Sequence, residues 1–160
     1  MTRLKNKKIL LVILILILLV VASAFLIEYK LGHQPCKLCI YERIPYIVSI
    51  FLIAKIIFIN SYEKITLLIL FVVFAISTIL AFYHFGIEQG FFIESNMCAT
   101  QHLKENLSKE QLIEQLKQNI ISCKDVTYRI FGLSLATINT IFSFILSVIF
   151  IKLFLNYGKN

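Results

Sequence analysis

Charged residues are sparse in this sequence. Lysine, arginine, aspartate and glutamate make up 16% of its 160 residues, whereas 59% are apolar, and the mean hydropathy is +0.84. Such a composition excludes an ordinary soluble domain, and long runs without charge indicate helices that cross a membrane. The sequence also lacks internal repeats and low-complexity linkers, so we expect one domain over residues 1–160.

Four apolar segments are candidates for crossing the bilayer. Three of them lack aspartate, glutamate, lysine and arginine over 19, 23 and 22 positions, namely residues 9–27, 65–87 (where only His84 can titrate near neutral pH) and 130–151. The fourth, residues 44–59, is shorter and contains Lys55, which lies near its end and can reach the headgroups. About 20 apolar residues cross the hydrocarbon. We therefore expect an all-α membrane protein, a four-helix bundle whose spans cover residues 9–27, 40–59, 65–87 and 130–152.

Basic residues predict the orientation of this bundle. Four spans place both termini on the same side, and Arg3, Lys5, Lys7 and Lys8 precede the first span. By the positive-inside rule these termini lie in the cytoplasm. The outer loops, about residues 28–39 and 88–129, then face outward. The net charge of +7 follows from this topology, and no soluble domain is present to carry a nucleic-acid-binding patch.

The first span has a second interpretation. Its basic start, apolar stretch and Ala22-Ser23-Ala24 resemble a cleavable signal peptide. The apolar run is longer than that of a usual signal peptide and continues to Ile27. We therefore expect this helix to be retained, and cleavage would leave the sidedness of the later segments unchanged.

None of the four cysteines falls within an expected span. Cys36 and Cys39 lie in the first outer loop, and Cys98 and Cys123 lie in the second. Disulfides persist outside the reducing cytosol, so this placement favours bridges. Four cysteines allow three pairings, and the spacing favours Cys36–Cys39 and Cys98–Cys123.

The C-x-x-C motif at residues 36–39 suits several kinds of chemistry, and missing residues exclude some of them. Haem attachment requires histidine directly after the second cysteine, where this chain has Ile40. Zinc would need Cys98 and Cys123 or histidines to complete the ligands, and a second C-x-x-C is lacking, so we expect no metal. A structural bridge over so small a loop would remove little chain entropy. The motif therefore predicts a redox-active dithiol.

The neighbours of this motif favour a reactive thiol. Pro35 suits the start of a helix, whose free N–H groups and dipole would stabilise a thiolate on Cys36. Arg43 shares a helical face with Cys36 and Cys39, within reach of a thiolate or an oxygen-rich partner. The alternative is that Arg43 only anchors the helix at the interface.

Pro45 complicates this geometry. Inside a helix it removes the hydrogen bond to Tyr41, so we expect a kink or a restart there. The cysteines would then occupy a short interfacial helix before the main span.

These residues together resemble the DsbB family, the quinone-reducing membrane proteins of disulfide formation. The signature lies in CKLCIYERIPY at residues 36–46, with further matches in YHFGIE at 83–88 and FGLS at 131–134. The resemblance covers nearly the whole chain. It implies an enzyme of the bacterial inner membrane, with both termini cytoplasmic and the cysteine loops in the periplasm.

The resemblance also implies a relay of thiols. The reduced thiolate of a soluble periplasmic DsbA-like thiol oxidase attacks Cys98, which releases its bridge partner Cys123. Cys123 attacks Cys36, and Cys39 is freed as a thiolate facing ubiquinone or menaquinone. All four cysteines are thus expected to be catalytic.

The resemblance assigns a role to Arg43, and position in the sequence suggests roles for four other polar residues. Arg43 resembles the family's quinone-site arginine, and His84 is a candidate for the quinone pocket or for proton uptake. The alternative for His84 is an ordinary interfacial histidine. Glu88 and Gln89 are expected to be solvated or to cap their helix, and Asn139 to form a hydrogen bond between helices.

Two other functions stay open at this point. A four-helix membrane scaffold with purely structural disulfides would explain the same cysteines. A vitamin K epoxide reductase-like enzyme would place C-x-x-C near the last span, whereas here it follows the first. This sequence also departs from many relatives of the DsbB family at Glu42, where they carry an amide.

Overall fold

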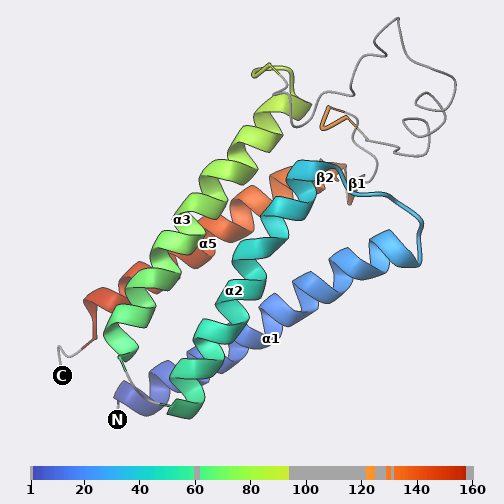
Figure 1. Cartoon of the computed structure of the whole chain (residues 1–160). Helices are drawn as coiled ribbons and strands as arrows, with labels where there is room; N and C mark the ends of the chain where they lie inside the picture. The colour runs from blue at the N-terminus through green and yellow to red at the C-terminus, as the bar shows by residue number, and fades with distance from the viewer. Residues whose placement is uncertain (1, 60–61, 94–121, 125–128, 131, 158–160) are drawn as a thin grey trace, which may run out of the picture.

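Helices dominate the computed structural model, which describes residues 2–59, 62–93, 122–124, 129–130 and 132–157 (Figure 1). Within these residues there are four helices and one hairpin of two-residue strands. The helices are α1 (Thr2–Tyr29), α2 (Lys37–Ile59), α3 (Glu63–Glu88) and α5 (Leu135–Leu155), and the strands are β1 (Arg129–Ile130) and β2 (Leu133–Ser134). The predicted all-α architecture is confirmed, apart from this small hairpin.

Three of the described helices are long and apolar enough to cross a membrane, over Lys7–Tyr29, Glu63–Glu88 and Leu135–Leu155. Large apolar side chains on them, such as Leu19 and Ile79, are more than 60% exposed. Exposed side chains of this kind suit contact with lipid tails. α2 has 23 residues but is less uniformly apolar, because it contains Glu42, Arg43 and Lys55. The protein is thus an all-α membrane protein.

The last helix begins later than the sequence predicted. Ile130, Leu133 and Ser134 belong to the hairpin strands, in which Ile130 pairs with Leu133, and Gly132 has a φ of 82°. Glycine adopts this left-handed conformation without strain. α5 starts after Ser134, whose Oγ accepts a hydrogen bond of 3.2 Å from the backbone N–H of Thr137. This cap fixes the start of the helix, so the boundary predicted at residue 130 is wrong.

α2 is continuous through Pro45, so the predicted restart on a separate helix is wrong. The ring removes one backbone hydrogen bond, but neighbouring helices support such a position in membrane proteins. Side chains that follow Pro45 are buried against those neighbours, including Tyr46 and Ile53. Cys39 therefore lies in the first turn of the main helix and not on a separate interfacial one.

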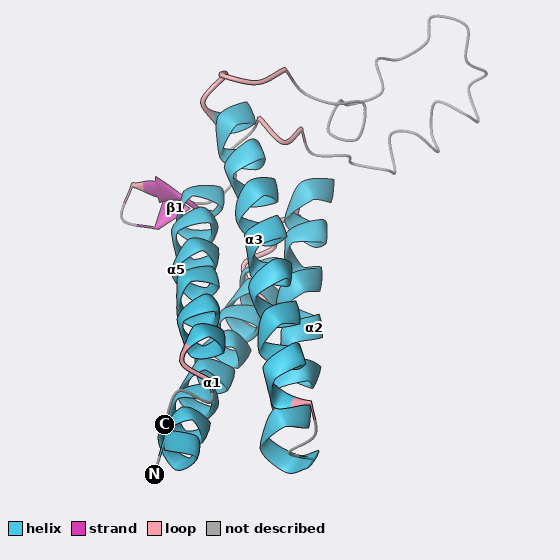
Figure 2. Cartoon of the chain, turned by 90° about the vertical axis from the view of Figure 1, so that its left-hand side faces the viewer, coloured by secondary structure: helices cyan, strands magenta, loops and turns pink. Residues whose placement is uncertain are grey.

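One end of the bundle contains the main hydrophobic core, and the other end contains a cavity. Both termini lie at one end, and the start of α2, the end of α3 and the start of α5 meet at the other (Figure 1). Figure 2 shows the hairpin beside the start of α5 at this second end. The core nearer the termini is built around Phe74, which stacks on Phe150 at 5.5 Å between ring centroids and meets Tyr46 edge-on. This core holds the helices in register for the site at the other end.

Candidate functional site

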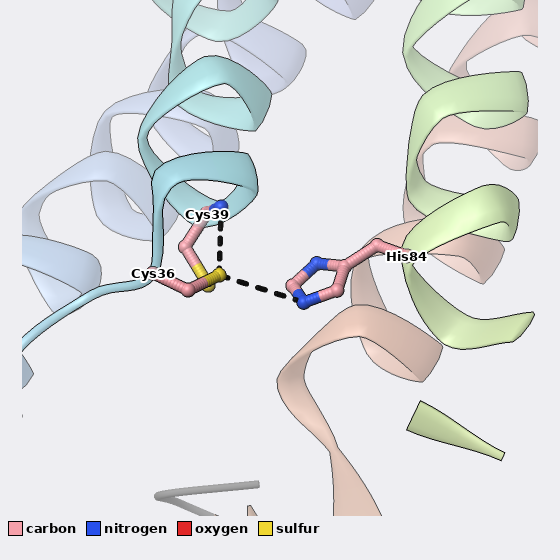
Figure 3. A group of neighbouring side chains, drawn as sticks. All are labelled: Cys36, Cys39 and His84. Atoms are coloured by element: carbon pink, nitrogen blue, oxygen red, sulfur yellow. Dashed lines mark hydrogen bonds between the residues drawn. The ribbon is translucent and has the colours of Figure 1, made fainter. Parts of the chain in front are cut away.

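Cys36 occupies the position just before α2. Its Sγ accepts a hydrogen bond of 3.2 Å from the backbone N–H of Cys39, and its carbonyl accepts one from Ile40 (Figure 3). The sulfur therefore caps the helix in the way that an oxygen does at other helix starts. The predicted placement of this thiol at a helix N-terminus is confirmed.

Cys36 and Cys39 are free thiols whose Sγ atoms lie 2.7 Å apart. The bridge favoured by the spacing is therefore open, and the structure shows the dithiol form of the motif. Disulfide formation requires a separation of about 2.05 Å. The two sulfurs are already placed for closure with little movement of the backbone.

His84 reaches the dithiol from α3. Its Nε2 lies 3.6 Å from Cys36 Sγ (Figure 3). Its Nδ1 lies 2.8 Å from an oxygen of Glu42. The His84 side chain is 3% exposed and that of Glu42 is 8% exposed. The carboxylate therefore orients the ring so that the opposite nitrogen faces the sulfur.

A hydrogen-bonded network extends from Glu42 into the bundle. Its second oxygen accepts a bond of 2.7 Å from Asn139 Nδ2, and Tyr46 donates its hydroxyl to Asn139 Oδ1. Ser143 Oγ continues the chain, 2.8 Å from the Tyr46 hydroxyl and 3.2 Å from Ser77. Asn139 thus forms the predicted bonds between helices.

Sequence analysis gave Glu42 no role in this network. Two signals were present: an acidic residue inside an apolar segment, and its spacing of three from Cys39. Its partners lie 42 and 97 positions away in the chain. That distance is why neither signal could identify what it binds.

Arg43 contacts α1 in the structure. It forms an ion pair with Glu28, and its guanidinium lies 5.1 Å from the centroid of the Phe25 ring. Cation–π contact and the ion pair together fix the position of the guanidinium. These contacts join α2 to α1, and the sequence gave no indication of Glu28 as the partner of Arg43.

One cavity of about 300 Å³ joins these groups. Its apolar wall comes mainly from α1 and α5, with Val20, Ala24, Ile27, Ile138 and Phe142. Its polar part contains Cys36, Cys39, Glu42, Arg43, His84, Glu88, Cys123 and Asn139. An apolar pocket with a few convergent polar groups is typical of a site for a small organic molecule.

Cys123 also lines this cavity. It is 2% exposed, packs in one cluster with Cys36, Leu38 and Ile87, and is disulfide-bonded. Cys98, its predicted partner, lies outside the described residues. The structure thus brings Cys36, Cys39, Arg43, His84 and Cys123 to one place.

Glu88 differs from the sequence expectation of a solvated or capping residue. Its side chain is 6% exposed and lines the cavity, with Oε1 3.9 Å from His84 Nε2. Its Oε2 is buried and has no hydrogen-bond partner within the described part of the chain. Glu88 lies one turn after His84 on α3, so both side chains face the cavity.

The electrostatics of the site favour a thiolate at Cys36. Hydrogen bonding from Cys39 lowers the pKa of Cys36, and the hydrogen bond and positive charge of His84 lower it further. Burial opposes these effects, and the resulting pKa is about 5, against an ordinary value of 9.0. With Cys36 ionised, Cys39 is the donor in the bond between the two sulfurs. Cys36 is therefore a nucleophile at neutral pH.

This charge state gives a prediction for the protein with Cys98 and Cys123 both replaced by serine, which leaves only the C-x-x-C thiols. In the reduced variant, thiolate absorbance should rise in a first step with a midpoint near pH 5. Adding His84→Gln should move that step to higher pH, because a favourable charge is lost. A first step at pH 8 or above would contradict the assignment.

Comparison with known proteins agrees with this geometry. The family model described as disulfide bond formation protein DsbB matches residues 6–153, which include the C-x-x-C motif, His84 and Cys123. An uncharacterized protein of Rickettsia prowazekii (strain Madrid E) is 30% identical over 158 residues, covering 98% of this chain and 91% of that protein. The chain therefore belongs to the DsbB family, and it is a membrane thiol oxidoreductase of disulfide formation.

Proposed function

We propose that this protein reoxidises a periplasmic DsbA-like dithiol and passes the electrons to a membrane quinone, ubiquinone or menaquinone. The observation that carries the proposal is the single cavity that joins both C-x-x-C thiols, Cys123 and Arg43 to an apolar wall. A structural disulfide would need neither an ionisable thiol nor an adjoining cavity. An enzyme that couples a thiol to a lipid-soluble acceptor needs both.

The proposed topology has four spans. Three are the helices that are long and apolar enough to cross a membrane, and the fourth is α2. At 1.5 Å per residue, its 23 residues extend about 35 Å, enough for a hydrocarbon core of about 30 Å. Its charges lie toward its two ends. The basic N-terminal tail supports cytoplasmic termini in a bacterial inner membrane, with loops 28–39 and 88–129 in the periplasm.

The proposed relay conserves electrons at each exchange. The reduced partner attacks Cys98 of the Cys98–Cys123 bridge and leaves with its own disulfide closed, so that both cysteines become thiols. These thiols reduce the Cys36–Cys39 bridge and close again. Each exchange transfers two electrons and two protons. Burial of Cys123 in the same cluster as Cys36 supports the second exchange.

The cavity fits a quinone head group by chemistry. Arg43 offers a hydrogen-bond donor for a quinone oxygen, His84 a second polar contact, and the α1 and α5 side chains an apolar surface for the ring. When bound, a quinone supplies an acceptor for two electrons and two protons. The chain's own contribution is to hold Cys39 beside that acceptor, to keep Cys36 ionised through His84, and to exclude water.

The redox potentials explain why such an acceptor is required. DsbA-type proteins have potentials near −120 mV, whereas structural disulfides lie below about −300 mV, and 30 mV corresponds to about 1.4 kcal/mol for two electrons. An ordinary disulfide could not oxidise such a partner. Removal of the electrons to a lipid-soluble acceptor makes the overall reaction favourable.

Removing the quinone should stop turnover. We expect the purified protein in detergent, without oxygen, to oxidise a reduced DsbA-like protein continuously only when quinone is supplied. Without quinone, oxidation should end once the protein's own disulfides are consumed, because the electrons have no outlet. The measurement is free thiol against time. A rate that is the same with and without quinone would favour the scaffold with structural disulfides.

A further inference from the structure

The cavity contains three metal-ligating atoms that lie close together. The thiol relay does not require these three atoms to be neighbours. Cys36 Sγ, Cys39 Sγ and a ring nitrogen of His84 all lie within 4.8 Å of one another. Two thiolates and an imidazole are ligands that Zn²⁺ prefers. We propose that the reduced form of this protein binds one Zn²⁺ through Cys36, Cys39, His84 and Glu88.

The distances suit a tetrahedral ion. With Zn–S near 2.3 Å and Zn–N near 2.0–2.1 Å, a tetrahedron places sulfur about 3.6 Å from nitrogen and about 3.8 Å from sulfur. Cys36 Sγ already lies 3.6 Å from His84 Nε2. The two sulfurs, at 2.7 Å, must separate by about 1 Å. A rotation of the Cys39 side chain in the first turn of α2 provides this movement.

Glu42 supplies the support that zinc-bound histidines have. Metal-ligating imidazoles almost always donate their other N–H to a carboxylate or carbonyl, which fixes the tautomer and raises the basicity of the ligand. His84 Nδ1 lies 2.8 Å from Glu42 Oε1, so Nε2 is the nitrogen left for the metal. Glu42 is fixed in turn by Asn139.

Glu88 is the carboxylate proposed for the fourth position; it lies outside the group of three whose ligand atoms are within 4.8 Å of one another, so its side chain must move toward the sulfurs on binding. Its Oε1 lies 3.9 Å from His84 Nε2, near the separation of adjacent ligands in a zinc site, and its side chain is 6% exposed. Its Oε2 is buried without a partner among the described residues. An unpaired buried carboxylate oxygen is costly, and coordination of a cation would remove that cost. The sequence offered Cys98 and Cys123 or histidines to complete a zinc site, and the structure places His84 and Glu88 there.

Binding exchanges protons for the ion and transfers no electrons. Zn²⁺ displaces the remaining thiol protons of Cys36 and Cys39 and leaves both sulfurs as thiolates. A Cys36–Cys39 disulfide has no thiolate to offer, so only the reduced motif binds. The site needs only this dithiol form, and it does not depend on the proposed quinone reaction.

Cobalt offers a direct spectroscopic test. The Cys98→Ser/Cys123→Ser protein, reduced with a phosphine in detergent without oxygen, is titrated with Co²⁺ and then with Zn²⁺. We expect one ion per chain, sulfur-to-cobalt charge-transfer bands with tetrahedral ligand-field bands, and their loss when Zn²⁺ displaces Co²⁺. Oxidation with diamide should abolish the bands, and renewed reduction should restore them. Bands that are absent, or equal in the oxidised protein, would overturn the proposal.

Variants identify the other ligands. Glu88→Gln should weaken Zn²⁺ binding at least about tenfold, and Glu42→Gln about 10–100-fold, as found for partners of metal-bound histidines. Glu63→Gln is the matched control, because Glu63 is also buried but lies at the opposite end of α3. Its affinity should be unchanged. Equal affinity of the Glu88 variant and this control would overturn the four-ligand site. The bands of the parent protein remain decisive if a variant fails to fold, and no quinone or thiol substrate enters the assay.

Discussion

Replacement of Cys39 with serine should lower quinone-linked oxidation of a DsbA-like dithiol by at least about a thousandfold. Serine cannot form the Cys36–Cys39 disulfide, so the step that hands electrons to the acceptor is lost. The Cys98–Cys123 bridge of the proposed relay is not altered by this substitution. The variant should therefore still accept one exchange and then stop. Stopped-flow measurement of thiol loss under turnover conditions tests this.

A matched substitution distinguishes loss of the thiol from damage to the helix start. Ile40 follows Cys39 directly but is 50% exposed on the outer face of α2. Ile40→Ser introduces the same side chain there, and its rate should stay within about twofold of the parent, as surface substitutions usually perturb little. Turnover retained in Cys39→Ser would remove the relay and leave the scaffold function. Alkylation and mass spectrometry of the stopped variant would identify its remaining bridge.

Glu42→Leu should lower the free energy of unfolding by about 2–4 kcal/mol, because it leaves one buried and one half-buried donor without an acceptor. These donors are His84 Nδ1 and Asn139 Nδ2, which now bond to the two carboxylate oxygens. Leucine fills a similar volume, so little of the loss comes from packing. Unfolding in mixed micelles with increasing SDS measures the change.

Two further variants test whether the network causes that loss. Glu42→Gln keeps an acceptor oxygen and should cost less than about 1 kcal/mol, near the average for hydrogen bonds between membrane helices. Asn139→Ala combined with Glu42→Leu should cost less than the sum of the two single changes, because they share one bond. Strict additivity would show that Glu42 and Asn139 contribute independently.

Much of the fold could be predicted because apolar length alone decides which segments suit a bilayer. Three of the four expected spans are confirmed as candidates on that basis, and the thiols lie at a helix start as Pro35 indicated. The start of α5 could not be predicted from hydropathy, which continues through residues 130–134. A capping hydroxyl on Ser134 and the turn at Gly132 set that boundary instead.

The site was predicted less completely than the fold. Local spacing was sufficient for Cys36, Cys39 and Arg43, which share one helical face. Glu28 and Glu42 acquire their partners from other helices, and this depends on how each helix is rotated about its axis. A single sequence does not reveal how each helix is rotated about its axis. Pro45 shows the same limit, since burial of its neighbours outweighed its local preference for a break.

The unbroken course of α2 links the depth of the dithiol to the thickness of the membrane. In the proposed four-span topology, α2 is one continuous helix from Cys39 to Lys55, so a tilt or vertical shift that keeps Lys55 at the headgroups also moves the sulfur along the bilayer normal. Helices adjust to thinner or thicker membranes by such movements. In that topology, lipid chain length would change how readily the Cys39 thiol meets the proposed lipid-soluble acceptor.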